Sequence, residues 1–168
     1  MKKSVLVLIL GIALLAAFGP EAQAQIPKEG TSSATWAFCG PFKAIPMGQE
    51  RIQMTYEVMG VAIGETSEDL FHNASFRCLG ALHAVKGKYD NNRGFCVSTR
   101  PDGDQVFFTY EVTGELGRSG KGTTTIVGGT GKLTGIQGNF EYTQLMMRPS
   151  AEGTLQGYNR GKGHYKLP

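Results

Sequence analysis

Apolar and polar residues alternate along most of the chain after residue 24. Phe108, Tyr110 and Val112, for example, alternate with Thr109 and Glu111. A period of two is typical of a β-strand with one buried face, and no stretch keeps apolar residues at helical spacing for more than one or two turns. The pattern predicts an all-β fold, in which residues 82–86 fit either a strand or a helical turn. The predicted strands are residues 34–38, 51–62, 70–79, 82–86, 94–100, 105–115, 122–127, 135–145 and 153–165.

Three segments between the predicted strands carry turn chemistry. Residues 101–104 read Pro-Asp-Gly-Asp, and Asp-Gly tolerates the positive φ that a tight hairpin requires. Residues 90–94 form a second turn signal, and residues 128–132 join a threonine-rich strand to an aromatic return strand. Several short strands joined by turns predict a sandwich or a barrel.

Glycine favours the barrel. The chain has 24 glycines, and 13 of them lie between Gly114 and Gly163. Glycine weakens a strand unless it marks a bend, a bulge or a close backbone approach, all of which a small closed barrel needs. We therefore predict one domain, residues 25–168, that forms a small antiparallel β-barrel of about eight strands. Side chains fill the interior of such a barrel, or it holds one small ligand.

The first 24 residues have the pattern of an export signal. Lys2 and Lys3 precede an uncharged apolar run, residues 5–18, and Ala22-Gln23-Ala24 offers small residues for cleavage after Ala24. The run is shorter than the ~20 residues of a membrane span, although an uncleaved anchor is the alternative. We predict a cleaved signal peptide, residues 1–24, a periplasmic or extracellular product, and no stable membrane insertion after cleavage.

Three cysteines follow the predicted signal, so a monomer holds at most one disulfide. Cys78 and Cys96 lie in predicted strands separated by one excursion of the chain. We predict that these two form the bridge in an oxidising compartment and that Cys39 stays free.

Charge and motifs exclude several functions. The net charge is only +3, far from that of a dedicated nucleic-acid binder. His72, His83 and His164 lack metal-ligand spacing, so we predict no metal. The glycine segment 126–134 fails both the phosphate-loop and the dinucleotide pattern, and no activated nucleophile is present, so we predict no cofactor.

An internal echo supplies the candidate site residues. Thr-Tyr-Glu-Val at residues 55–58 recurs at residues 109–112. If the echo has a function, Glu57 and Glu111 occupy equivalent places, where burial would raise the pKa of a carboxyl in the interior toward acid–base use. Alternatively, these letters simply make good strands with a solvated face. The sequence leaves open which face points inward. The candidate ligand-binding residues are Tyr56, Glu57, Phe108, Tyr110 and Glu111.

Residues 122–138, Gly-Thr-Thr-Thr-Ile-Val-Gly-Gly-Thr-Gly-Lys-Leu-Thr-Gly-Ile-Gln-Gly, resemble the late hairpin of the allene oxide cyclase and dirigent barrels. The resemblance covers roughly residues 102–142. It implies a calyx-like barrel of eight antiparallel strands, often dimeric or trimeric, that holds small hydrophobic or phenolic molecules. Some members steer cyclisation or radical coupling without a cofactor. No catalytic residue of these families can be placed on a position of this chain.

Three functions fit these observations. The first is an exported, non-catalytic barrel that binds a small apolar or aromatic molecule and forms a possible homo-oligomer. The second is a cofactor-free cyclase or isomerase, and the third is an envelope interaction protein with a filled barrel. An apolar cavity of ~300 Å³ or more would favour the first two, and a packed interior would favour the third.

Overall fold

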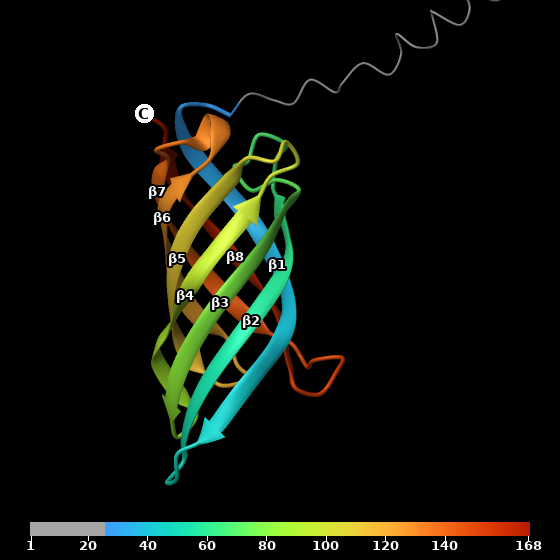
Figure 1. The fold of residues 1–168 in the computed structure, drawn as a ribbon, viewed down its shortest axis with the longest axis vertical. Helices are drawn as coiled ribbons and strands as arrows, with labels where there is room; N and C mark the ends of the chain where they lie inside the picture. The colour runs from blue at the N-terminus through green and yellow to red at the C-terminus, as the bar shows by residue number, and fades with distance from the viewer. Residues whose placement is uncertain (1–25) are drawn as a thin grey trace, which may run out of the picture.

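The computed structural model describes residues 26–168, in which eight antiparallel strands close into a barrel in chain order (Figure 1). The predicted signal peptide, residues 1–24, lies outside the described residues. The strands are β1 (Glu29–Pro46), β2 (Arg51–Gly64), β3 (Ala74–Val85), β4 (Lys88–Thr99), β5 (Gln105–Glu115), β6 (Gly120–Gly129), β7 (Gln137–Met146) and β8 (Thr154–Lys166). A short 3-10 helix, η2 (Gly131–Leu133), precedes β7. The predicted all-β barrel of about eight strands is confirmed.

Alternation along each strand determines which residues enter the interior. In β5, Tyr110 and Val112 are buried, whereas Glu111 between them and Thr113 beyond them are exposed. Closure follows from the first and last strands, because β8 pairs with β1 from Glu29 opposite Lys166 onward. Each strand is thus paired on both sides, and the barrel exposes no unpaired sheet edge.

One predicted turn is absent and another lies where we expected it. Residues 90–94 lie inside β4, with a register irregularity between Tyr89 and Asn92, and the true turn is Lys86–Gly87, where φ is 51° and 77°. Of residues 82–86, which fitted a strand or a helical turn, residues 82–85 form the end of β3 and Lys86 lies in the turn. The hairpin at residues 101–104 is present, with a φ of 88° at Gly103.

The start of β1 and the C-terminus lie at one end of the barrel (Figure 1). The buried β2–β3 connection plugs this closed end. We predicted a strand from residue 70, but Leu70 and Phe71 lie in this connection and are almost completely buried. Their place is stabilised by side chains: the Leu70 N–H donates to Oγ of Ser32 at 3.0 Å, and Arg100 donates to the Leu70 carbonyl. Backbone groups bonded in this way are satisfied without a neighbouring strand.

Aromatic rings fill the barrel behind the plug. The Phe71 ring packs edge-to-face on Trp36 and Phe140, with centroids 5.4 Å apart in each pair, and on Phe108 at 5.9 Å. Such contacts contribute beyond simple area burial. They close one end of the interior, so any cavity must lie toward the other end.

The predicted disulfide is confirmed. Cys78 on β3 and Cys96 on β4 are directly opposite in the register, with Cα atoms 4.1 Å apart, and their sulfur atoms are bonded. Cys39 on β1 is free and exposed. Within residues 26–168 no helix is long and apolar enough to cross a membrane.

Candidate functional site

A cavity of about 100 Å³ lies inside the barrel between the aromatic plug and the opposite end. This volume is below the ~300 Å³ typical of sites for drug-sized ligands. The interior is therefore mostly filled, and the remaining space suits a small group. Its floor consists of Trp36, Phe71, Phe76, Phe108 and Phe140.

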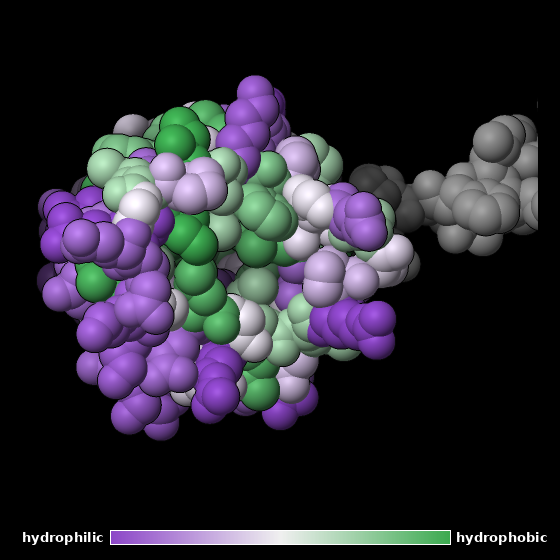
Figure 2. Space-filling view, turned by 90° about the horizontal axis from the view of Figure 1, so that it is seen from below, coloured by the Kyte–Doolittle hydropathy of each residue, from purple (hydrophilic) through white to green (hydrophobic). Residues whose placement is uncertain are grey.

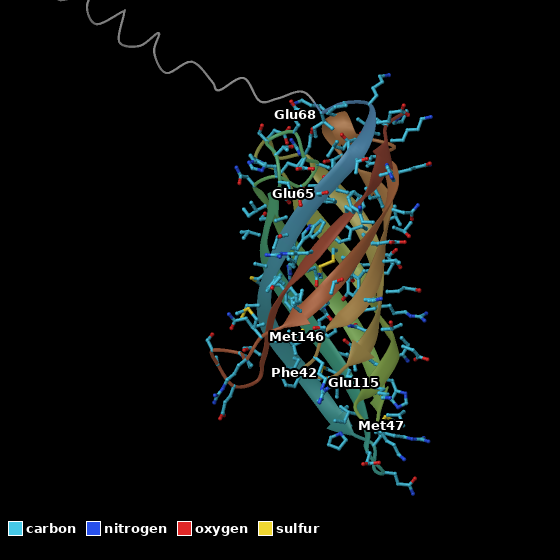
Figure 3. All side chains as sticks on the ribbon, turned by 180° about the vertical axis from the view of Figure 1, so that it is seen from behind. Phe42, Met47, Glu65, Glu68, Glu115 and Met146 are labelled. Carbon is cyan, nitrogen blue, oxygen red and sulfur yellow. A yellow bond between two sulfur atoms is a disulfide. The ribbon has the colours of Figure 1, made fainter. Side chains whose placement is uncertain are left out.

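The cavity extends toward the barrel end formed by the β1–β2, β3–β4, β5–β6 and β7–β8 turns. Leu116 and Gly117 of the β5–β6 turn line it there, together with Met146 and Leu155. We call these four residues the mouth. Figure 2 views this end and shows hydrophobic residues around the barrel axis, with polar residues gathered to one side. Figure 3 places Met146 and Glu115 in this half of the molecule, and Glu65 and Glu68 at the closed end.

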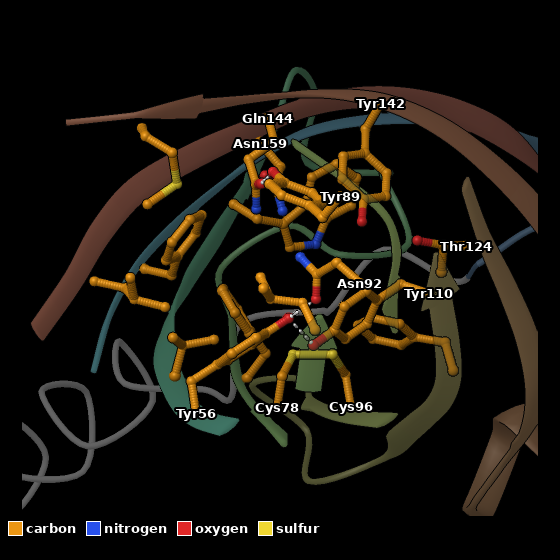
Figure 4. A pocket seen from close by; sticks show the side chains of 18 of the residues that line it. Tyr56, Cys78, Tyr89, Asn92, Cys96, Tyr110, Thr124, Tyr142, Gln144 and Asn159 are labelled. Atoms are coloured by element: carbon orange, nitrogen blue, oxygen red, sulfur yellow. Dashed lines mark hydrogen bonds between the residues drawn. A yellow bond between two sulfur atoms is a disulfide. The ribbon is translucent and has the colours of Figure 1, made fainter. Parts of the chain in front are cut away.

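A chain of hydrogen bonds crosses the wall of the cavity (Figure 4). The Tyr56 hydroxyl donates to Oδ1 of Asn92 and lies 2.7 Å from the Tyr110 hydroxyl. A hydroxyl has one hydrogen, and Tyr56 uses its hydrogen toward Asn92, so Tyr110 must donate to Tyr56. Both hydrogens are then used within the chain, and the Tyr110 oxygen keeps acceptor capacity. We call Tyr110, Tyr56 and Asn92 the tyrosine chain.

These tyrosines are neutral at physiological pH. Burial raises the pKa of Tyr56 to about 12, which outweighs its hydrogen bonds to Tyr110 and Asn92. Burial and the neighbouring Tyr56 raise the pKa of Tyr110, and the same two causes act on Tyr142. No Asp, Glu, His, Lys or Arg is among the residues that line the cavity. The site is polar in places but carries no charge.

Glycines on the neighbouring strands make room for the tyrosines. Gly80 and Gly94 are opposite each other on β3 and β4. A Cβ atom at either position would overlap the Tyr110 hydroxyl, and one at Gly80 would also overlap Tyr56. The close approach of the tyrosine side chains therefore requires glycine at both positions. Close approach is one of the roles that the sequence analysis gave to glycine in a small barrel.

A second polar group lies elsewhere on the wall. The Tyr89 hydroxyl of β4 donates to Oε1 of Gln144 on β7 at 3.4 Å, which spans the interior between the two strands. Asn159 of β8 is opposite Gln144 in the register and lines the same cavity. Thr124 and Tyr142 add hydroxyl groups to the lining (Figure 4).

The structure separates the five predicted site residues into two groups. Tyr56, Phe108 and Tyr110 line the cavity. Glu57 and Glu111 do not, because they alternate with the tyrosines and face outward: Glu57 pairs with Arg77, and Glu111 is exposed. The hypothesis of paired carboxylates in the interior is thus wrong about their position. Ligand binding by the other three residues stays a prediction.

Sequence reasoning missed Asn92, Tyr89, Gln144 and Asn159. Asn92 and Tyr89 lie in or beside the segment that we interpreted as a turn, because Asp-Asn-Asn-Arg-Gly has strong turn chemistry. Gln144 and Asn159 are single polar residues within strands, and nothing in the letters indicates which way they face. No group of three or more potential metal ligands occurs in residues 26–168.

The sequence matches no protein-family model and no curated relative. Its fold, however, is similar to the solved structure of a pterocarpan synthase dirigent protein, with a TM-score of 0.50. The match covers 89% of this chain and 100% of that chain at 9% sequence identity. At this identity the similarity concerns the fold alone. It agrees with the closed barrel of eight antiparallel strands, and the chain therefore has a dirigent-like β-barrel fold.

Proposed function

We propose that this protein binds a small, neutral aromatic molecule in the interior of its barrel and does not transform it. The observation that carries the proposal is the lining of the cavity: aromatic rings form the floor, and uncharged hydroxyl and amide groups lie on the wall. An apolar pocket with a few converging polar groups is the usual form of a small-molecule site.

The size of the cavity limits the ligand. Its volume is about 100 Å³, whereas an apolar cavity of about 150 Å³ in another protein takes up benzene. A single small ring is thus the largest group that we expect inside. Any further part of the ligand would extend through the mouth, past Leu116 and Met146.

The absence of charge on the lining supports a neutral ligand and a non-catalytic role. A buried anion or cation without a partner is strongly unfavourable, and no lining side chain could pair with one. General acid–base catalysis uses a group with a pKa near the working pH. The raised pKa values of Tyr56, Tyr110 and Tyr142 keep these hydroxyls protonated, so they act as hydrogen-bonding groups and are poor proton donors for catalysis.

The proposal includes export to the periplasm or the medium. The Cys78–Cys96 disulfide supports it, because such bridges persist mainly in oxidising compartments. The pattern of residues 1–24 points the same way.

The test uses Trp36, the single tryptophan of the chain, which lines the cavity. We expect phenol to change Trp36 fluorescence saturably in the wild type. Met146→Tyr places a larger side chain at the mouth and should weaken binding by about tenfold, or about 1.4 kcal/mol. Met147→Tyr is the matched control, because Met147 is 52% exposed and does not line the cavity. Equal phenol affinity in both variants, or no saturable change in the wild type, would contradict the proposal.

Two observations favour the third function of the sequence analysis. The interior is mostly filled, since its cavity of about 100 Å³ is below the ~300 Å³ that would favour a ligand-binding barrel. The outer wall exposes a group of apolar side chains on neighbouring strands, Met59, Val61 and Ile63 on β2, Leu79 on β3 and Phe95 on β4. A surface of this kind is typical of contact with another protein or a second copy of the chain. Native mass spectrometry of the protein purified from its own source reads both possibilities together, as a retained small molecule or as an oligomer.

A further inference from the structure

Asn159 holds an unsatisfied acceptor in the wall of the cavity. Its Oδ1 is buried and has no hydrogen-bond partner among residues 26–168, and the residue lines the cavity. In the register Asn159 lies between Trp36 on β1 and Gln144 on β7. Buried polar groups in folded proteins are nearly always hydrogen-bonded, because an unmade bond costs the full desolvation of the group. This oxygen therefore requires an explanation.

The unsatisfied oxygen of Asn159 differs from the other unsatisfied polar atom in the barrel, which has a structural explanation. Among residues 26–168 the other buried side-chain polar atom without a hydrogen bond is Nε of Arg100. That atom lies 3.7 Å from Oδ1 of Asp102 at the closed end, so an opposite charge compensates it. Asn159 has no such compensation, because no charged side chain lines the cavity.

The position of Asn159 points to the ligand as the missing donor. In Figure 4, Asn159 and Gln144 lie on the opposite side of the cavity from Tyr56 and the Cys78–Cys96 disulfide. The space between the two sides is that in which the proposed function places the aromatic ring. Oδ1 of Asn159 is thus within the wall that a bound ring would face.

We propose that Oδ1 of Asn159 accepts a hydrogen bond from a neutral hydroxyl or N–H group of the bound molecule and so selects rings that carry a donor. This inference rests on the proposed function. A methyl ether of the same ring offers no donor and leaves Oδ1 unsatisfied. A site with a buried acceptor left unsatisfied discriminates strongly against such a ligand. An ammonium group is disfavoured as the donor, since no carboxylate in the lining would balance its charge.

The experiment compares phenol with anisole, which replaces the hydroxyl by a methoxy group. Trp36 fluorescence reports binding of both probes to the wild type, to Asn159→Leu and to Asn139→Leu. Asn139 is the matched control, because it is an exposed asparagine on the outer face of β7, bonded to Thr125. We expect the wild type and Asn139→Leu to prefer phenol by about three- to tenfold. In Asn159→Leu this preference should disappear while anisole still binds.

A stability measurement on the empty protein distinguishes ligand selection from a structural role. Leucine at position 159 removes an unpaired acceptor, so the urea midpoint of Asn159→Leu should equal or exceed that of the wild type. Asn159→Ala repeats the comparison with a smaller side chain if leucine prevents folding. A preference for phenol that survives in the Asn159 variants overturns the inference and leaves the proposed function intact. If the wild type binds neither probe, the proposed function itself fails.

Discussion

The Tyr56 hydroxyl connects two other polar groups of the interior, and its removal affects both. Tyr56→Phe leaves Oδ1 of Asn92 without its donor and the Tyr110 hydroxyl without its acceptor. An unsatisfied buried group costs about 1–3 kcal/mol, so we expect the free energy of unfolding to fall by about that amount. Urea unfolding followed by circular dichroism measures the change.

The control for this substitution is Tyr158→Phe. Tyr158 lies on β8, and the Arg160 guanidinium lies 5.4 Å from the centroid of its ring, a contact that phenylalanine can retain. We expect little change in its unfolding midpoint. Similar midpoints for Tyr56→Phe and the wild type would show that the tyrosine chain contributes nothing measurable to stability.

At the level of single residues, the sequence indicated only part of the site. The echo of Thr-Tyr-Glu-Val placed Tyr56 and Tyr110 in equivalent strand positions, and their hydroxyls meet in the interior. The echo could not indicate the inward face, because alternation separates the two faces of a strand but does not show which of them points into the barrel. Burial decided the question, since Val58 and Val112 share the tyrosines' side of the strand. Asn92 was missed because its turn preference was outweighed by strand pairing.

Among the connections, the one between β2 and β3 holds the plug in place through Asp69. One carboxylate oxygen accepts from the Ser33 N–H at 2.8 Å, and the other accepts from the Thr66 N–H at 2.7 Å. Burial opposes ionisation of Asp69, but these hydrogen bonds outweigh it and lower its pKa. A pKa below that of the unfolded chain means that the carboxylate stabilises the folded state above about pH 4. This contribution is lost as the pH falls through the folded-state pKa.

We expect Asp69→Asn to lower stability at pH 7 by about 1–3 kcal/mol, because charged acceptors form the stronger bonds. The difference from the wild type should shrink as the pH falls below about 4, where the wild-type carboxyl becomes protonated. Urea midpoints between pH 2 and 7 measure it. Glu68→Gln, a change at an exposed neighbour, should leave the profile unchanged. A constant difference between Asp69→Asn and the wild type at all pH values would refute the assignment.

Elements with strict alternation were predictable, and those held by side-chain bonds were not. The hairpin at residues 101–104 and strand β5 lie where the letters placed them, because turn chemistry and period two agree there. Leu70 and Phe71 look like the start of a strand, yet they enter the barrel end as a plug. Their partners, Ser32 and Arg100, are distant in sequence, so no local pattern reveals the contact.

In the whole molecule, closure of the barrel joins the strands, the plug and the cavity into one structural unit. Every strand has two neighbours, and the interior is continuous from the plug to the mouth. Two-residue periodicity and glycine density were enough to predict the closed barrel. They could not predict how much of the interior stays open, because that depends on how tyrosine and phenylalanine rings interdigitate. A single closed sheet should therefore unfold in one cooperative step.

Removal of the Cys78–Cys96 disulfide tests whether the barrel unfolds in one cooperative step. The bridge joins residues 18 positions apart in adjacent strands, and closing a loop of about that length constrains the unfolded chain by about 3 kcal/mol. Cys78→Ser with Cys96→Ser should lower the free energy of unfolding by about 2–4 kcal/mol. Because the barrel is one unit, circular dichroism and the fluorescence of Trp36 on β1 should report the same lowered midpoint. Cys39→Ser, at an exposed free cysteine, should leave it unchanged. Separate transitions for the two probes would mean that β3 and β4 unfold apart from the rest.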